Sequence, residues 1–160
     1  MKRLLASVAL VSVFSGCTEP DPVDLNNLIR EGDRFVQVPG EPYSGPVFRL
    51  HENRQVAMEG TLKDGVFHGP LSAFNEEGQL MVEMNYEEGV ESGSYVEYWG
   101  NGQRKREAYL VNGEWDGPHR LFSAEGEITS EGRYANGERC GLWLESGVEK
   151  THPPCPDPRQ

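Results

Sequence analysis

Residues 94–113 read SYVEYWGNGQRKREAYLVNG, and this stretch decides the fold. Two short runs of strand-forming residues, 94–99 and 104–110, stand on either side of the turn signal Gly100-Asn101-Gly102, and Asn112-Gly113 closes the second run. Glycine-rich pairs between such runs predict β-hairpins. The stretch therefore predicts one hairpin, with glycine turns at its tip and at its exit.

The features of this hairpin recur at a spacing of 24 residues, with no insertion between Gly45 and Gly141. The recurring positions form five columns: Gly45, Gly69, Gly93, Gly117 and Gly141; Gly65, Gly89, Gly113 and Gly137; Gly78, Gly102 and Gly126; Glu59, Glu83, Glu107 and Glu131; and Leu62, Tyr86, Leu110 and Tyr134. Self-similarity at one fixed spacing indicates a repeat protein. Glycine in three of the columns predicts turns with positive φ.

A single repeat cannot fold alone. It offers about five large apolar side chains, each worth roughly 1.5–3 kcal/mol when buried, whereas ordering its residues costs on the order of 1.5 kcal/mol per residue. Each hairpin must therefore extend the sheet of its neighbours. We predict an all-β fold, an elongated antiparallel β-hairpin repeat array with a 24-residue period and about four repeats plus partial end repeats.

The first residues have the composition of an export signal. Lys2-Arg3 precede an apolar run over residues 4–14, and Ser15-Gly16-Cys17 ends the segment. The stretch is too short to cross a bilayer as a helix. It resembles a bacterial lipoprotein signal, which implies that Cys17 is acylated and anchors the chain. An ordinary secretory signal with a chance cysteine is the alternative. No aspartate follows Cys17, so the resemblance implies the outer membrane in a Gram-negative host.

The chain divides into four predicted segments. These are a lipoprotein signal peptide (1–16), a polar tether (17–33), the β-repeat domain (34–150) and a proline-rich tail (151–160). Without its signal peptide the chain keeps 13 basic and 26 acidic side chains. Such a charge repels nucleic acid and anionic lipid headgroups, so we expect neither as a partner.

Two stretches carry a resemblance to a known family. Residues 59–69 (EGTLKDGVFHG) and 131–141 (EGRYANGERCG) resemble the MORN repeat, in which an acidic-glycine pair, an aromatic residue, Asn-Gly and a second glycine recur along a β-hairpin. The spacing of 24 is similar to that of the bacterial YwqK-type variant. The resemblance covers roughly residues 43–147 and implies the fold, with Met84 and Ala108 departing from the pattern. YwqK-type chains are often labelled antitoxins, which implies a protein partner.

The sequence holds no catalytic or metal-binding constellation. The four histidines share no ligand spacing, and CxxC, HExxH and G-x-S-x-G motifs are absent from the sequence. No glycine-rich loop leads from a strand into a helix, as a phosphate site requires. We therefore expect a protein that is not an enzyme and that has no cofactor and no bound metal.

Two sets of side chains are candidates for surface roles. The glutamate column is expected to be structural, each carboxylate accepting hydrogen bonds from turn N–H groups; calcium binding is the alternative. Aromatic residues crowd the later repeats, more than one face of a thin sheet can bury, and an exposed subset predicts a partner-binding patch. The candidates are Tyr95, Tyr98, Trp99, Trp115 and Trp143.

Cys140 and Cys155 remain once Cys17 is acylated. An exported protein meets an oxidising compartment, where an even pair of cysteines usually forms a disulfide. Such a bridge folds the tail back along residues 142–147 and shields the open edge of the sheet. Two free thiols on a frayed end are the alternative.

These patterns predict a lipid-anchored, non-catalytic protein of the bacterial cell envelope, either periplasmic or surface-exposed. Its role is binding or scaffolding toward a protein partner. The first alternative is an antitoxin or immunity protein that neutralises a basic toxin. An envelope enzyme is the least favoured alternative.

Overall fold

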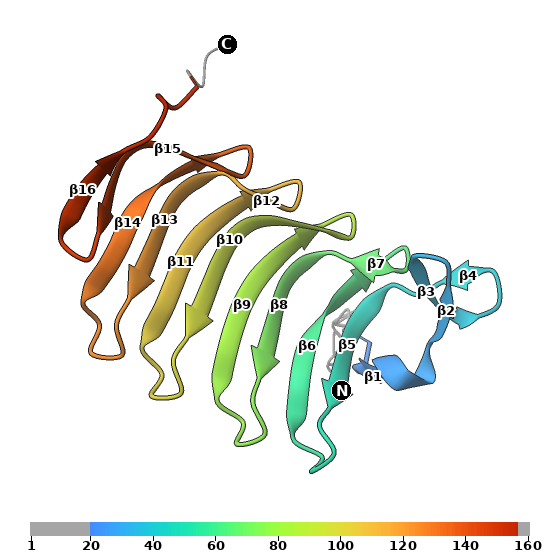
Figure 1. The fold of residues 1–160 in the computed structure, drawn as a ribbon. Helices are drawn as coiled ribbons and strands as arrows, with labels where there is room; N and C mark the ends of the chain where they lie inside the picture. Colours follow the sequence, from blue (N-terminus) through green and yellow to red (C-terminus); the bar gives the residue numbers. More distant parts are fainter. Residues whose placement is uncertain (1–19, 157–160) are drawn as a thin grey trace, which may run out of the picture.

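The computed structural model describes residues 20–156, which form one large sheet, one small sheet and a single short 3₁₀ helix (Figure 1). The N-terminal elements are β1 (Val23–Asp24), the helix η1 (Leu25–Asn27), β2 (Ile29–Glu31), β3 (Arg34–Val38) and β4 (Glu41–Pro42). The hairpin strands are β5 (Gly45–Leu50), β6 (Val56–Lys63), β7 (Val66–Phe67), β8 (Gly69–Phe74), β9 (Leu80–Glu87), β10 (Val90–Tyr98), β11 (Arg104–Val111), β12 (Glu114–Trp115), β13 (Gly117–Phe122), β14 (Ile128–Ala135), β15 (Glu138–Glu145) and β16 (Val148–Thr151).

The large sheet consists of hairpins placed side by side in chain order. Its strand order is β1-β5-β6-β8-β9-β10-β11-β13-β14-β15-β16, and the two-residue strands β7 and β12 pair with β6 and β11. Among these described strands only β1 pairs in parallel, with β5. Figure 1 shows an elongated, twisted sheet in which the described chain starts at one end and finishes at the other. The predicted all-β fold of antiparallel hairpins is confirmed.

Gly113 shows why glycine occupies the turns. Asn112 and Gly113, between β11 and β12, have φ values of 52° and 82°, a conformation that asparagine and glycine adopt at the least cost. The Gly113 N–H donates to the carbonyl of Glu91 in the preceding hairpin at 2.8 Å. The equivalent donors and acceptors are Gly65 to Tyr43, Gly89 to Phe67 and Gly137 to Trp115. The nine glycines of the first two columns all have positive φ. One row of backbone hydrogen bonds thus joins successive hairpins.

The large sheet has two chemically distinct faces, because successive residues of a strand point to opposite sides. We call one side the aromatic face; it carries Leu71, Tyr95, His119 and Trp143 from β8, β10, β13 and β15. We call the other the glutamate face; it carries Glu59, Glu83, Glu107 and Glu131 from β6, β9, β11 and β14. The pairs His119–Gly132 and Arg120–Glu131 in β13 and β14 show the alternation.

The N-terminal segment covers the aromatic face at the first hairpins. Leu25, Leu28 and Tyr43 are buried in one cluster with Val47, Met58, Leu62 and Leu71. Asp24 caps η1 by accepting a hydrogen bond from the N–H of Asn26 at 2.9 Å. The structure therefore differs from the tether predicted over 17–33, because β1, η1 and β2 occupy its second half. The small sheet β2-β3-β4 precedes the first hairpin as a separate sheet, and the two leucines supply apolar surface that covers this end of the aromatic face.

The last hairpin also differs from the prediction. Ser146 and Gly147 have φ values of 50° and 80°, and this tight turn leads into β16, which pairs with residues 142–145 of β15. The N–H of His152 then donates to the carbonyl of Gly141, and the N–H of Gly141 to that of Pro153, both at 2.8 Å. The edge over 142–145 is therefore covered by a strand, and the proline-rich tail lies beside Gly141 instead of along 142–147.

Candidate protein-binding surface

A continuous row of rings crosses the aromatic face of the later hairpins. The row consists of Tyr95, Trp115, His119, Tyr134, Trp143 and His152. Successive ring centroids lie 5.2, 5.8, 5.2, 5.1 and 6.1 Å apart. Such spacings are those of packed aromatic pairs, so the row forms the core of this part of the sheet.

Trp143 is the most buried member of the row, with 0% of its surface exposed. Its ring lies on Gly132, where a Cβ atom would come within 2.2 Å of the indole. The indole N–H donates to the carbonyl of Arg133 at 3.2 Å, and the Arg139 guanidinium covers the ring at 4.3 Å from the centroid. Trp143 therefore cannot contact a partner in this fold, contrary to the prediction from the sequence.

Tyr95 and Trp115 are half-buried in the same row. The Arg106 guanidinium lies 5.8 Å from the Trp115 ring centroid, and burial raises the pKa of the Tyr95 hydroxyl, with a further contribution from Glu97. Both rings pack chiefly against their neighbours, which leaves them little free surface for a partner.

His119 is a buried titratable residue within the row. It is 7% exposed, and burial lowers its pKa to about 4, with smaller contributions from the charges of Arg106 and Arg139. Its Nδ1 atom has no hydrogen-bond partner within residues 20–156. A neutral imidazole is therefore packed here as an aromatic ring.

Tyr98 and Trp99 lie outside the row. The Tyr98 hydroxyl donates to Glu83 on the glutamate face. The Trp99 indole N–H donates to the carbonyl of Phe122 in the next hairpin at 3.1 Å, and Lys105 Nζ lies 4.9 Å from its ring centroid. Both aromatic side chains are half-buried. Tyr98 links two adjacent strands and Trp99 links two successive hairpins, so both stabilise the sheet and leave little surface for a partner.

The glutamates of the later hairpins are paired with arginines. Arg120 in β13 stands opposite Glu107 in β11 and Glu131 in β14. Its Nη1 lies 3.8 Å from Glu107 and its Nε 3.2 Å from Glu131, and Arg104 also contacts Glu107. Among residues 20–156 these glutamates accept no hydrogen bond from a turn N–H group, contrary to the expectation, because they lie within strands β11 and β14.

The glutamates of the first hairpins have different neighbours. Ser72 in β8 stands opposite Glu59 in β6 and Glu83 in β9, the position that Arg120 takes 48 residues later. Within the part of the chain that the structure describes, Glu59 has no ion pair and no side-chain hydrogen bond, and Glu83 accepts only from the Tyr98 hydroxyl. The first two carboxylates of the column thus lack a cation.

A hollow of about 550 Å³ adjoins the Glu59 carboxylate. It lies on the glutamate face of β5, β6 and β8, and Pro46, Phe48, Leu50 and Val56 form most of its apolar wall. Glu59, Thr61, Pro70 and Ser72 are among its other lining residues. Sequence reasoning missed this site, although a signal exists: the column of positions 48, 72, 96, 120 and 144 has a basic residue only at 120.

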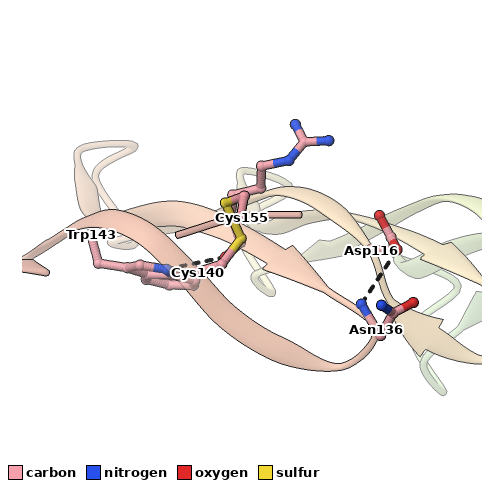
Figure 2. Close-up of a disulfide and its surroundings, with 6 residues drawn as sticks. Asp116, Asn136, Cys140, Trp143 and Cys155 are labelled. Atoms are coloured by element: carbon pink, nitrogen blue, oxygen red, sulfur yellow. Dashed lines mark hydrogen bonds between the residues drawn. A yellow bond between two sulfur atoms is a disulfide. The ribbon is translucent and has the colours of Figure 1, made fainter. Parts of the chain in front are cut away.

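Figure 2 shows the disulfide that joins Cys140 in β15 to Cys155 in the tail. The same view shows the Asn136 N–H, which donates to the Asp116 carboxylate at 3.3 Å. The bonded pair is the one expected from the sequence, and it fixes the tail beside Gly141. The lipidation candidate Cys17 lies outside the described residues.

Residues 20–156 were compared with the requirements of a metal site and of a membrane span. In that range no group of three or more His, Cys, Asp or Glu side chains is placed to hold a metal ion. None of the helices in the described part has the length and apolarity to cross a membrane. Comparison with protein-family models and with curated proteins finds no match for the chain.

Proposed function

We propose that this chain is a lipid-anchored, non-catalytic protein of a bacterial envelope, a MORN-like repeat array whose glutamate face binds a protein partner. The supporting observation is the hollow of about 550 Å³ on that face, with its apolar wall and its unpaired carboxylate Glu59. Exposed side chains continue along the face from Thr61 in β6 to Tyr109 in β11 and Leu142 in β15. Concave apolar surface beside polar groups is typical of binding sites.

The position of the proposed anchor agrees with this role. Pro22 lines the hollow, and Cys17 precedes it by five residues, so the chain between them spans at most about 18 Å. Acylation of Cys17 would hold the first hairpins near the membrane, while the later hairpins extend from them.

Anchoring is tested by metabolic labelling with palmitate. We expect the full chain to incorporate palmitate and to partition into detergent, and the variant Cys17→Ser to lose both properties. An unlabelled, soluble wild-type protein contradicts the anchor.

Binding is tested by co-purification from envelope extract, with the bound proteins identified by mass spectrometry. Thr61 and Arg49 are both exposed, Thr61 on the glutamate face and Arg49 on the aromatic face. We expect Thr61→Trp to lose a partner that Arg49→Trp retains. Loss of the partner in both variants, or in neither, contradicts binding by the glutamate face.

The net charge favours a second candidate function, an antitoxin or immunity protein. A chain with 26 acidic and 15 basic residues is suited to neutralising a basic protein. This candidate predicts that the co-purified partner is an exported basic toxin, and that cells without this protein are killed by it.

A further inference from the structure

We infer that the hollow of the first hairpins binds a protein segment that presents an arginine flanked by large apolar side chains. The inference rests on the proposed function, since it describes the partner of the same face. Its starting point is the register of the sheet, which places Ser72 between Glu59 and Glu83 as it places Arg120 between Glu107 and Glu131.

The later hairpins show how this arrangement accommodates a guanidinium. Arg120 reaches both of its glutamates from the strand between them. Around Ser72 the two carboxylates have the same strand positions, but the described chain places no cation between them. A guanidinium from a partner can occupy this place, because its planar fork donates to carboxylates on two sides. The net charge of −11 favours a basic partner in the same way.

The flanking residues explain why the partner segment carries apolar side chains. Phe48, Leu50 and Val56 line the hollow beside Glu59. The positions 48 residues later hold Val96, Tyr98 and Arg104, and Arg104 there pairs with Glu107. The glutamates of the later hairpins are thus paired with arginines of the same chain. The first hairpins instead combine an apolar wall and the unpaired carboxylate of Glu59 in one concave site. An acyl chain fits the wall alone and makes no use of Glu59.

The probe is a fluorescein-labelled peptide, Phe-Leu-Arg-Leu-Phe, and its control contains citrulline, an uncharged analogue of arginine. Both are titrated by fluorescence anisotropy against the full chain in detergent. We expect the arginine peptide to bind about fivefold more tightly than the citrulline peptide at low salt, with the difference shrinking at about 0.5 M salt.

Three variants test whether the preference for the arginine peptide arises at Glu59 and Ser72. Ser72→Arg supplies the missing cation from within and should remove the preference for arginine, as should Glu59→Gln. Glu107→Gln alters the equivalent position of the later hairpins and should keep it. Circular dichroism and thermal melting confirm that each variant is folded, and because Glu59 is exposed its variant serves if Ser72→Arg does not fold.

Equal affinity for the two peptides, no binding at about 1 mM, or an unchanged preference in Ser72→Arg overturns the inference. If both peptides bind and their affinity does not depend on Glu59, the hollow is an unspecific apolar site, and this result also overturns the inference. These outcomes are separate from those of the proposed function, because palmitate labelling and partner co-purification do not involve the peptide. A partner lost in Thr61→Trp together with equal peptide affinities would retain the function and end the inference.

Discussion

The two ends of the sheet bury their aromatic face in different ways. At the first hairpins, β5 to β8, a separate layer covers it, and Leu25 and Leu28 of the N-terminal segment pack on Leu62 and Leu71. At the last hairpins, β13 to β15, the described chain supplies no such layer, and the rings of Tyr134, Trp143 and His119 pack against one another.

One residue spacing thus serves two kinds of core. The backbone hydrogen bonds between hairpins are equivalent at both ends, so the turns do not decide how the face is covered. The way in which the aromatic face is buried depends on single residues. Leu71 is buried with the help of Leu25 and Leu28, whereas Trp143 at the equivalent position is large enough to cover Gly132 itself.

The largest effect is expected for Trp143→Ala. Removing a fully buried tryptophan should lower the free energy of unfolding by about 3–5 kcal/mol, and Leu25→Ala at the other end by about 2–5 kcal/mol. Urea unfolding measures both. Because each hairpin contacts only its neighbours, hydrogen exchange should rise in β13 to β15 for the first variant and in β5 and β6 for the second. Increased exchange spread evenly over the sheet in either variant contradicts two separate cores.

The next effect concerns the disulfide at the last hairpin. Cys140 and Cys155 are 15 residues apart, and closing a loop of this size is worth about 3 kcal/mol in the chain-entropy model. The double variant Cys140→Ser, Cys155→Ser should lose about that free energy of unfolding, with faster hydrogen exchange in β16. Wild-type protein in reductant is the control and should match it. Equal stability with and without the bridge contradicts a role in holding the tail.

A smaller effect distinguishes two equivalent glycines. A Cβ atom on Gly132 would lie 2.2 Å from the Trp143 ring, whereas one on Gly60 would lie 3.5 Å from Leu71, an ordinary contact. Gly132→Ala should therefore destabilise the fold by about 1–3 kcal/mol through overpacking, and Gly60→Ala far less, as thermal melting will show. Equal costs would mean that Trp143 does not rest on Gly132.

The smallest effect is a pH dependence. The folded pKa of His119 is lowered to about 4 from its ordinary value of 6.5, chiefly by burial. Between these values the unfolded chain binds the proton and the folded chain does not, so the contribution of His119 to stability falls as pH decreases from about 6.5 to about 4. The melting temperature of His119→Phe should therefore fall less over this range than that of wild type. Parallel curves contradict a buried neutral imidazole.

Local features of the sequence predict the turns well. Asn112-Gly113 and its equivalents specify hairpins through the backbone conformation of glycine, which depends on adjacent residues alone. Contacts between distant residues are less accessible to such reasoning. Leu25 and Leu28 stand in a polar stretch, and they are buried by packing in one cluster with Leu62 and Leu71, which lie far along the chain.

The hollow on the glutamate face was not predicted, for the same reason. Aromatic crowding indicated a patch, but whether Trp143 faces a partner or Gly132 depends on cross-strand register, which the sequence does not state directly. The difference between Ser72 and Arg120 is visible in the sequence. It indicates a missing cation only once the strand register is known, because the register places each residue between two glutamates.

We propose that the glutamate face of the first hairpins binds a protein. Site-specific photo-crosslinking in intact cells tests it most directly, with the photoreactive residue at Thr61 on that face or at Arg49 on the aromatic face, both exposed. We expect one protein to be crosslinked from Thr61 but not from Arg49, and its yield to fall when Ser72→Arg is added. A protein crosslinked equally from both positions, or no crosslinked protein from Thr61, would contradict it.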